Sequence, residues 1–199
     1  HGVILQRGRD VVCVDPISGK DVWVRENMES GSTLFGDDEV LLIVPSSKTD
    51  AAVVATVVRP RDGKLLGTRP VPPVKQRLAL VGRRVLQFSE VGKKVELKLI
   101  DPWQKQEIWK REFDAYSRVH VVDGEAVAVM QRSGKFQLLL IEDASVRIEA
   151  ELEAEPRLTS IRLKKYHDLY LLMAAVPSTR TSANDNVTPL NGSPGLFTG

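Results

Sequence analysis

The sequence predicts an all-β fold, a β-propeller built from four-stranded antiparallel blades, and three observations carry that prediction. Short apolar runs recur at intervals of 45, 42 and 43 residues. A polar turn followed by an apolar strand recurs on nearly the same interval, and each period has room for four short strands separated by turns. A period of about 40–45 residues with four strands per unit is typical of propeller blades. The runs begin at Val40, Val85, Val127 and Tyr170.

The periods divide the chain into about four blades. We expect a partial blade at residues 1–30, three blades at 31–73, 74–116 and 117–156, and a partial blade at 157–199 that ends in a long loop, 177–199. The first unit has no first strand, and the last has no third or fourth strand. Closing a ring from these ends would duplicate the second strand, so we expect a segment of a longer ring. The chain also starts with His1 rather than Met.

Strands within a unit are separated by turn residues such as Gly92 and Gly134. In the first unit we expect strands at 3–6, 10–14 and 21–25, and in the last at 159–164 and 168–175. In the third unit we expect 77–81, 84–89, 95–100 and 107–113, and in the fourth 118–122, 125–131, 136–141 and 147–152. The second strands, such as 168–175, are apolar throughout, which predicts cover on both faces. Residues 147–152 alternate instead, which predicts an outer strand although 149–155 have a helix-favouring composition.

The composition is typical of a folded domain, and it gives no indication of a nucleic-acid partner or a membrane span. The 199 residues are 42% hydrophobic and 27% charged, with a net charge of +2 and a pI near 8.7. This mild balance does not suggest nucleic acid, and acidic residues dilute the basic pairs at 83–84, 93–94, 110–111 and 164–165. No run approaches the ~18 apolar residues of a membrane span. We therefore expect no nucleic-acid partner and no transmembrane segment in this chain.

The segment from Cys13 to Trp23 contains a sequence motif. Residues 13–23 read Cys-Val-Asp-Pro-Ile-Ser-Gly-Lys-Asp-Val-Trp. The segment resembles the tryptophan-docking motif of PQQ-like (quinoprotein alcohol dehydrogenase-like) repeats, small/apolar-x-Asp-x-x-Thr-Gly-x-x-x-Trp, with Ser18 in place of Thr. In such a turn the aspartate bonds the backbone, Gly19 takes a positive φ, and the tryptophan docks between blades.

Two partial copies follow at intervals of 44 and 42 residues. Residues 59–67 keep Asp62 and Gly63 but have Gly67 where the motif has tryptophan. Residues 101–109 keep the aspartate and the tryptophan but lack the glycine, and the fourth copy, at 142–145, has decayed. We expect the Gly67 junction to be less tightly packed, with Leu65 and Leu66 partly filling it. The residues to which we assign a structural blade-docking role are Asp15, Gly19, Trp23, Asp62, Gly63, Asp101 and Trp109.

Other residues give no catalytic or metal-binding pattern. Cys13 lies in an apolar run and is expected to be a buried, inert thiol. The histidines at 1, 120 and 167 lack metal-ligand spacing, and 120 and 167 are expected in a strand and in a turn. The acidic or amide runs at 37–39 and 184–186 lack the spacing of a calcium loop. The triplets at 186–188 and 191–193 match a glycosylation sequence, which we interpret as incidental.

Three functions remain open, of which a scaffold is favoured. We expect a non-catalytic, bacterial PQQ-like propeller that binds a protein or another polymer through its blade loops, with no cofactor. The alternatives are part of a PQQ-dependent quinoprotein dehydrogenase and a sensor domain of a larger protein. Dehydrogenases of the family use a disulfide between adjacent cysteines, which one cysteine cannot form. The resemblance implies an extracytoplasmic location, and the loop at 177–199 is expected to be mobile or to contact a partner.

Overall fold

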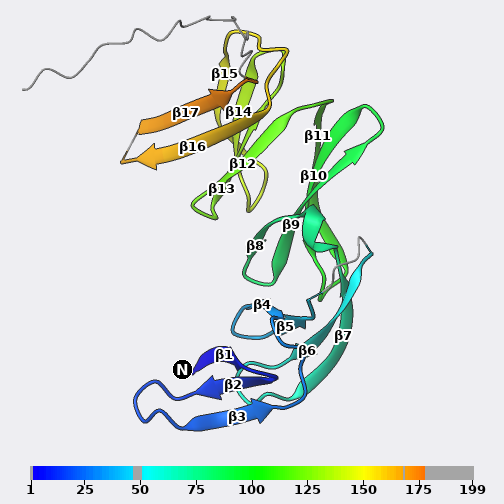
Figure 1. The fold of residues 1–199 in the computed structure, drawn as a ribbon, viewed down its shortest axis with the longest axis vertical. Coiled ribbons are helices and arrows are strands. Elements are labelled where there is room, and N and C mark those ends of the chain that lie inside the picture. Colours follow the sequence, from blue (N-terminus) through cyan, green and yellow to red (C-terminus); the bar gives the residue numbers. More distant parts are fainter. Residues whose placement is uncertain (1, 47–50, 168, 178–199) are drawn as a thin grey trace, which may run out of the picture.

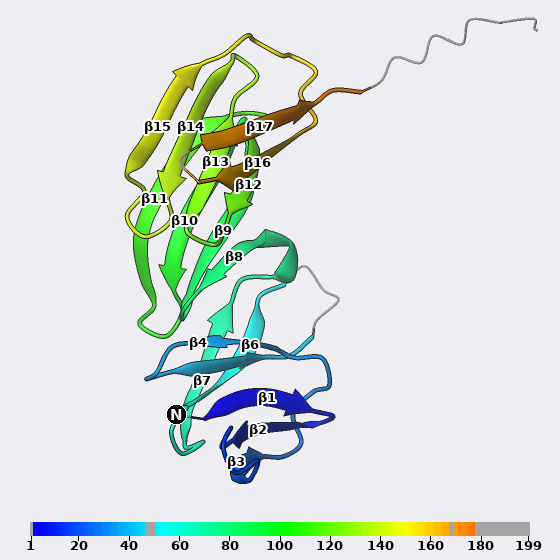
Figure 2. The same cartoon turned by 90° about the vertical axis from the view of Figure 1, so that its left-hand side faces the viewer.

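The computed structural model describes residues 2–46, 51–167 and 169–177, and over these residues the chain is almost entirely β. Antiparallel strands form sheets of three, four, four, four and two strands, each paired in sequence order. The sheets follow one another along the long axis of the molecule (Figures 1 and 2). One short 3-10 helix, η1 (Val74–Gln76), precedes the third sheet. This is the blade architecture of a β-propeller.

In blades 1, 3, 4 and 5, for which strand positions were predicted, the strands begin and end within two residues of the expected positions. Blade 1 contains β1 (Val3–Arg7), β2 (Asp10–Val14) and β3 (Asp21–Arg25). Blade 2 contains β4 (Thr33–Gly36), β5 (Leu41–Val44), β6 (Val53–Val58) and β7 (Leu65–Val71). Blade 3 contains β8 (Arg77–Val81), β9 (Arg84–Val91), β10 (Lys94–Asp101) and β11 (Gln106–Asp114). Blade 4 contains β12 (Arg118–Val122), β13 (Ala126–Met130), β14 (Lys135–Leu140) and β15 (Val146–Glu151), and blade 5 contains β16 (Ser160–Tyr166) and β17 (Leu169–Ala175).

A bulge recurs at one place in the outer strand pair of blades 1 to 4. The register shifts between Cys13 and Val14, and at the matching positions of the other three blades. Such a shift re-aims the side chains that follow it. It also aligns the blades residue by residue, because the residue before the bulge pairs with Trp23 in blade 1 and Trp109 in blade 3. By this alignment β1 is a second strand, so blade 1 lacks a first strand among the described residues.

The core lies between the blades. One apolar cluster joins blade 1 to blade 2, and three more join each later blade to the next. β5 and β13 are buried at every position, so the expectation that second strands are covered on both faces is confirmed for them. In β15, Ile148 and Ala150 are half-buried while Glu149 and Glu151 are exposed, which confirms the alternating outer strand.

The expectation that second strands are covered on both faces was wrong for β17, the second strand of the last blade. Tyr170 and Leu172 of β17 pack on blade 4. On the other side of the strand, Leu169, Leu171 and Met173 are 75%, 51% and 40% exposed. The reason is positional, because no described sheet follows blade 5 and only one side of β17 finds a neighbour.

Some sequence interpretations fall outside the described residues. These are the loop beyond residue 177, the 184–186 run, both glycosylation triplets and the histidine at position 1. Within the described ranges, no helix is long and apolar enough to cross a membrane.

Candidate functional site

Trp23 of blade 1 docks on a turn of blade 2. Its indole Nε1–H donates a 2.7 Å hydrogen bond to the carbonyl oxygen of Pro60. Its ring lies against Gly63, where a Cβ would be 2.7 Å from the Trp23 Cδ2 atom. Gly63 also has a φ of 67°, in the left-handed region that favours glycine. Both the backbone conformation and the tryptophan ring therefore require glycine at position 63.

Trp109 makes the same contact two blades further on. Its Nε1–H donates a 2.7 Å hydrogen bond to the carbonyl oxygen of Ile141, in the turn between β14 and β15. Ile141 is the counterpart of Pro60, and the residue with positive φ in this turn is Ala144, at 57°. The fourth copy of the turn has therefore lost its sequence marker while keeping its geometry.

The junction between blades 2 and 3 uses a different aromatic contact. Gly67 takes the tryptophan position, and no atom lies within 4 Å of where its Cβ would be. Trp103, from the turn of the following blade, packs on the core at this junction. The Arg69 guanidinium stacks 4.4 Å from the centroid of the Trp103 ring, and Arg69 Nε donates a 3.0 Å hydrogen bond to the Trp103 carbonyl oxygen. Leu66 also packs there, as expected, whereas Leu65 is 48% exposed.

An arginine two residues after the tryptophan position also contacts the next blade, and the sequence analysis did not predict this contact. The arginines at 25, 69 and 111 are 44 and 42 residues apart, the same intervals as the turns. Arg111 Nη2 donates a 3.2 Å hydrogen bond to the carbonyl oxygen of Ala144 in the next blade, much as Arg69 reaches Trp103. The repeated spacing was the signal that could have revealed this second contact between blades.

The aspartates of the turns organise backbone N–H groups. Asp15 Oδ1 accepts hydrogen bonds from the N–H groups of Ile17 at 2.8 Å and Ser18 at 3.3 Å. These bonds hold the pKa of Asp15 below its usual value. Gly19 has a φ of 69°, and Asp62 Oδ1 accepts a 3.1 Å bond from the N–H of Lys64.

Asp101 likewise accepts a 3.0 Å hydrogen bond from the turn N–H of Gln104 at Oδ1, and it also takes part in an ion-pair network between blades 2 and 3. Its side chain is 3% exposed, and its Oδ2 accepts a 2.8 Å hydrogen bond from Arg83 Nε. Arg83 Nη1 lies 3.0 Å from Glu39 Oε2 and 3.3 Å from Asp37 Oδ2. The hydrogen bond with Asp101 is the main cause of the raised pKa of Arg83. The acidic residues at 37–39 therefore have two structural roles. Asp37 and Glu39 form ion pairs with Arg83. Asp37 Oδ1 also accepts hydrogen bonds from the N–H groups of Glu39 and Val40, which hold the turn.

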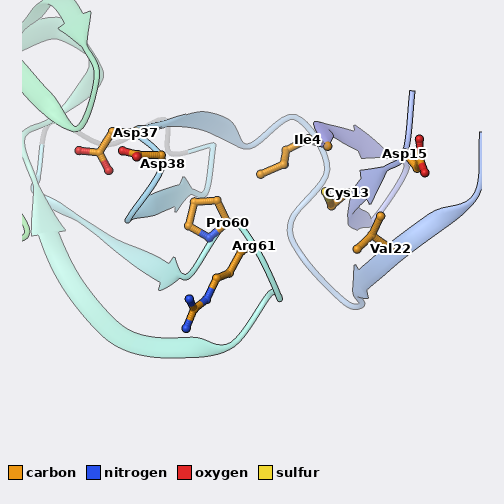
Figure 3. Close-up of a pocket in the computed structure, with 9 residues that line it drawn as sticks. Ile4, Cys13, Asp15, Val22, Asp37, Asp38, Pro60 and Arg61 are labelled. Carbon is orange, nitrogen blue, oxygen red and sulfur yellow. The ribbon is translucent and has the colours of Figure 1, made fainter. Parts of the chain in front are cut away.

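An open hollow of about 500 Å³ lies between blades 1 and 2 (Figure 3). Asp37 and Asp38 lie on one side of it, Ile4 and Val22 on the other, and the turn residue Arg61 between them. Asp38 and Arg61 form no hydrogen bond or ion pair with any residue that the structure describes. Both charges are thus available to a molecule that enters the hollow. The remaining lining residues are Gly2, Cys13, Asp15 and Pro60.

Three further hollows lie at the later blade junctions on the same end of the array. We name this end the turn face, because it carries the turns between first and second strands and between third and fourth strands. The turns concerned are 15–20, 37–40, 59–64, 82–83, 101–105, 123–125 and 141–145. The hollow between blades 3 and 4, about 470 Å³, is lined by Arg84, Glu125 and Glu142 among others. Smaller hollows of about 370 Å³ lie beside Arg83 and beside Lys164.

The described ranges contain no cluster of metal-ligating side chains. No three His, Cys, Asp or Glu side chains gather there to hold a metal ion. Cys13 is 4% exposed, which confirms a buried thiol, and burial raises its pKa. His120 lies in β12 and His167 in the turn after β16, both as expected.

No protein-family model matches the chain, and no curated protein matches it. Among solved structures it is similar to BamB from Moraxella catarrhalis at 13% identity and a TM-score of 0.33, over 81% of this chain and 63% of that one. It is also similar to Hsv2 from Kluyveromyces lactis at 11% identity and a TM-score of 0.43, over 79% and 48% of the two chains. Hsv2 from Kluyveromyces marxianus is 14% identical with a TM-score of 0.38, over 81% and 68%. The chain thus spans less than two thirds of the first two, and its fold class follows from its own sheets and their packing.

Proposed function

We propose that this chain is a non-catalytic scaffold of the PQQ-like propeller type that binds a protein or another polymer across its turn face. The observation that supports this most directly is the row of hollows at successive blade junctions on one end of the array. A row of shallow, open sites suits an extended polymer, which can cross several blades, better than a small molecule, which needs enclosure.

The charges of the turn face favour a polypeptide over a nucleic acid. Asp38 and Arg61, which no described residue pairs or hydrogen-bonds, lie in one hollow, and Asp15 and Asp37 also line it. Carboxylates at this density repel phosphate groups, whereas nucleic-acid grooves depend on clustered lysine and arginine. A polypeptide offers both charge signs together with apolar side chains for Ile4 and Val22. The resemblance of residues 13–23 further supports an extracytoplasmic, bacterial setting as part of the proposal.

Paired charge reversals test the choice of face. Asp38→Lys with Arg61→Glu reverses the hollow without changing the net charge. Glu90→Lys with Lys93→Glu does the same at the opposite end, beside the turn between β9 and β10. Partners captured by the unmodified chain are identified, purified and titrated against all three proteins. We expect the first pair to weaken binding at least tenfold and the second pair to leave it unchanged.

Three results would contradict the proposal. If the reversal at Glu90 and Lys93 weakened binding while the reversal at Asp38 and Arg61 did not, the turn face would be the wrong surface. Turnover of an alcohol or sugar by the purified chain with added quinone would favour the dehydrogenase alternative. If reversal at neither end mattered, the loops would not carry the interaction.

A further inference from the structure

The hollow between blades 3 and 4 reaches down to the apolar core. Its volume is about 470 Å³, and Val81, Leu99 and Ile141 are among the residues that line it. Leu99 and Ile141 are 0% and 1% exposed, and all three residues belong to the apolar cluster that joins blade 3 to blade 4. A molecule that enters this hollow therefore rests on apolar side chains, and covering them with an apolar group favours binding.

Three charged side chains also line this hollow. Blade 4 supplies Glu125 and Glu142, which are exposed, and blade 3 supplies Arg84, which is half-buried. None of the three forms an ion pair or a side-chain hydrogen bond with any residue that the structure describes. The neighbouring Arg83, in contrast, is bound by Asp101. Two carboxylates and one guanidinium are thus available to an occupant, with the negative charge in excess.

Main-chain hydrogen bonds hold the two turns that carry these carboxylates. The N–H of Ile141 donates a 2.9 Å hydrogen bond to the carbonyl oxygen of Glu125, which joins the two turns of blade 4. The carbonyl oxygen of Ile141 accepts the indole N–H of Trp109 at 2.7 Å, and Glu142 follows Ile141 directly. The backbones at Glu125 and Glu142 are therefore in place before a ligand arrives, and such preorganisation lowers the cost of binding.

The hollow between blades 1 and 2 does not offer the same excess of available carboxylates. There Asp37 pairs with Arg83, and Asp15 accepts hydrogen bonds from the N–H groups of its own turn. Asp38 and Arg61 remain, one charge of each sign. A cation is therefore favoured more strongly between blades 3 and 4 than between blades 1 and 2.

We propose that the hollow between blades 3 and 4 binds a lysine or arginine side chain of the polypeptide, an inference that rests on the proposed function of the turn face. The methylene stem packs on Leu99 and Ile141 while the cationic end reaches Glu125 and Glu142. Lysine and arginine commonly cover apolar surface with their stems and keep the charge at a polar edge. Arg84, on the blade 3 side, donates to a carbonyl oxygen of the bound main chain.

Short synthetic peptides test this assignment on the full chain. The probes are capped glycine–serine peptides that differ only in a central arginine, lysine, norleucine or glutamate. Proton–nitrogen correlation spectra of the isotope-labelled chain supply two reporters. The Trp109 indole N–H bonds to Ile141 beside the proposed site, and the Trp23 indole N–H bonds to Pro60 beside the hollow between blades 1 and 2.

The arginine and lysine peptides should move the Trp109 indole resonance until it saturates and leave the Trp23 resonance in place. The norleucine peptide should bind about tenfold more weakly, because it has the apolar stem without the charge-assisted hydrogen bonds to the two carboxylates. The glutamate peptide should not bind, because it brings a like charge to Glu125 and Glu142.

A paired substitution removes the two charges while keeping the shape of the side chains. Glu125→Gln with Glu142→Gln should reduce the affinity for the arginine peptide about tenfold, to the level of the norleucine peptide. The matched control is Glu90→Gln with Glu153→Gln, which neutralises two exposed carboxylates away from the turn face. The control should leave the affinity unchanged, and the spectrum of each variant shows whether the fold is intact.

Four outcomes would overturn the inference. They are equal binding of the norleucine and arginine peptides, tighter binding of the glutamate peptide, equal loss of affinity in the two paired variants, and no movement of the Trp109 resonance with any peptide. Each would leave the proposed function standing, because that proposal is tested by the reversal of Asp38 and Arg61 in a different hollow.

Discussion

The ring of Trp23 lies directly on the bare Cα of Gly63, so closely that a methyl group there would come within 2.7 Å of the Trp23 Cδ2 atom. Gly19 has nearly the same φ, 69° against 67°, but no atom within 4 Å of its Cβ position. Gly19→Ala should therefore cost only the left-handed backbone, about 1 kcal/mol. Gly63→Ala should cost about 2–4 kcal/mol, because it adds overpacking to the same backbone cost. Urea unfolding of both variants measures the difference, and equal losses would show that the ring moves aside freely.

We expect Trp109 and Trp23 to support the fold rather than a ligand site. Trp109→Phe should lose about 1–2 kcal/mol of unfolding free energy, because the hydrogen bond to Ile141 disappears while much of the packing remains. Trp109→Ala should lose about 3 kcal/mol, near the lower end for tryptophan because the residue is only half-buried. Chemical denaturation supplies both values. Unchanged stability together with lost partner binding would assign the tryptophan to a site.

Arg69 and Trp103 should be energetically coupled. A double-mutant cycle with Arg69→Ala and Trp103→Leu removes the stacking contact from each side in turn. We expect a coupling of about 0.5–1 kcal/mol, the usual size for a cation over an aromatic ring that is not fully desolvated. Arg7→Ala with Trp103→Leu is the control pair, because Arg7 lies in blade 1, and it should be additive. Additivity in both cycles would mean that the stacking contributes nothing.

The turn at Asp15 should lose its contribution to stability in acid. The pKa of Asp15 is lowered in the folded chain by the N–H groups of Ile17 and Ser18. The carboxylate therefore stabilises the fold above its unfolded pKa, about 3.9, and the contribution is lost as pH falls through the lower folded value. Asp15→Asn should flatten this part of the stability profile between about pH 5 and 2. Asp143→Asn should act similarly, since the Ser145 hydroxyl and N–H lower the pKa of Asp143. A wild-type profile in either variant would contradict the assignment.

The chain should bind neither pyrroloquinoline quinone nor calcium with micromolar affinity. The motivation is chemical, because the single Cys13 cannot form the disulfide that family dehydrogenases place against the quinone. Isothermal titration of each ligand into the purified chain is the measurement. Stoichiometric quinone binding would remove the support for a scaffold without a cofactor.

Most strands could be predicted from the sequence because blades repeat. The expected starts of β2, β8 and β12 are correct to the residue, and the apolar runs that follow the polar turns begin within one residue of β5, β9, β13 and β17. The period of two in residues 147–152 correctly outweighed the helical propensity of alanine and glutamate there. Contacts between blades were harder to foresee, because they join residues one period apart. The Arg83 network, for example, draws its acids from two different blades.

The positive-φ turn residue shows another limit of the sequence. The glycines at positions 19 and 63 allow a positive φ to be predicted from the sequence. Lys105 and Ala144 adopt a φ of 57° although neither is glycine. Bonding by the surrounding turn holds them there, for example from the Ala144 N–H to the Leu140 carbonyl oxygen. The exposure of β17 was missed for a different reason. The sequence of an apolar strand does not indicate whether a neighbouring blade is present to cover it.

The tryptophan contacts place different sequence requirements on the two blades that they join. The blade that gives the ring must encode one particular side chain, Trp23 or Trp109, whereas the blade that receives it accepts the indole N–H at a main-chain carbonyl oxygen and, in blade 2, also leaves room for the ring with Gly63. Every residue has that oxygen, so Pro60 and Ile141 serve equally well. The accepting position of a receiving turn can therefore change residue type without loss of the hydrogen bond, while in blade 2 the position three residues further on stays restricted to glycine.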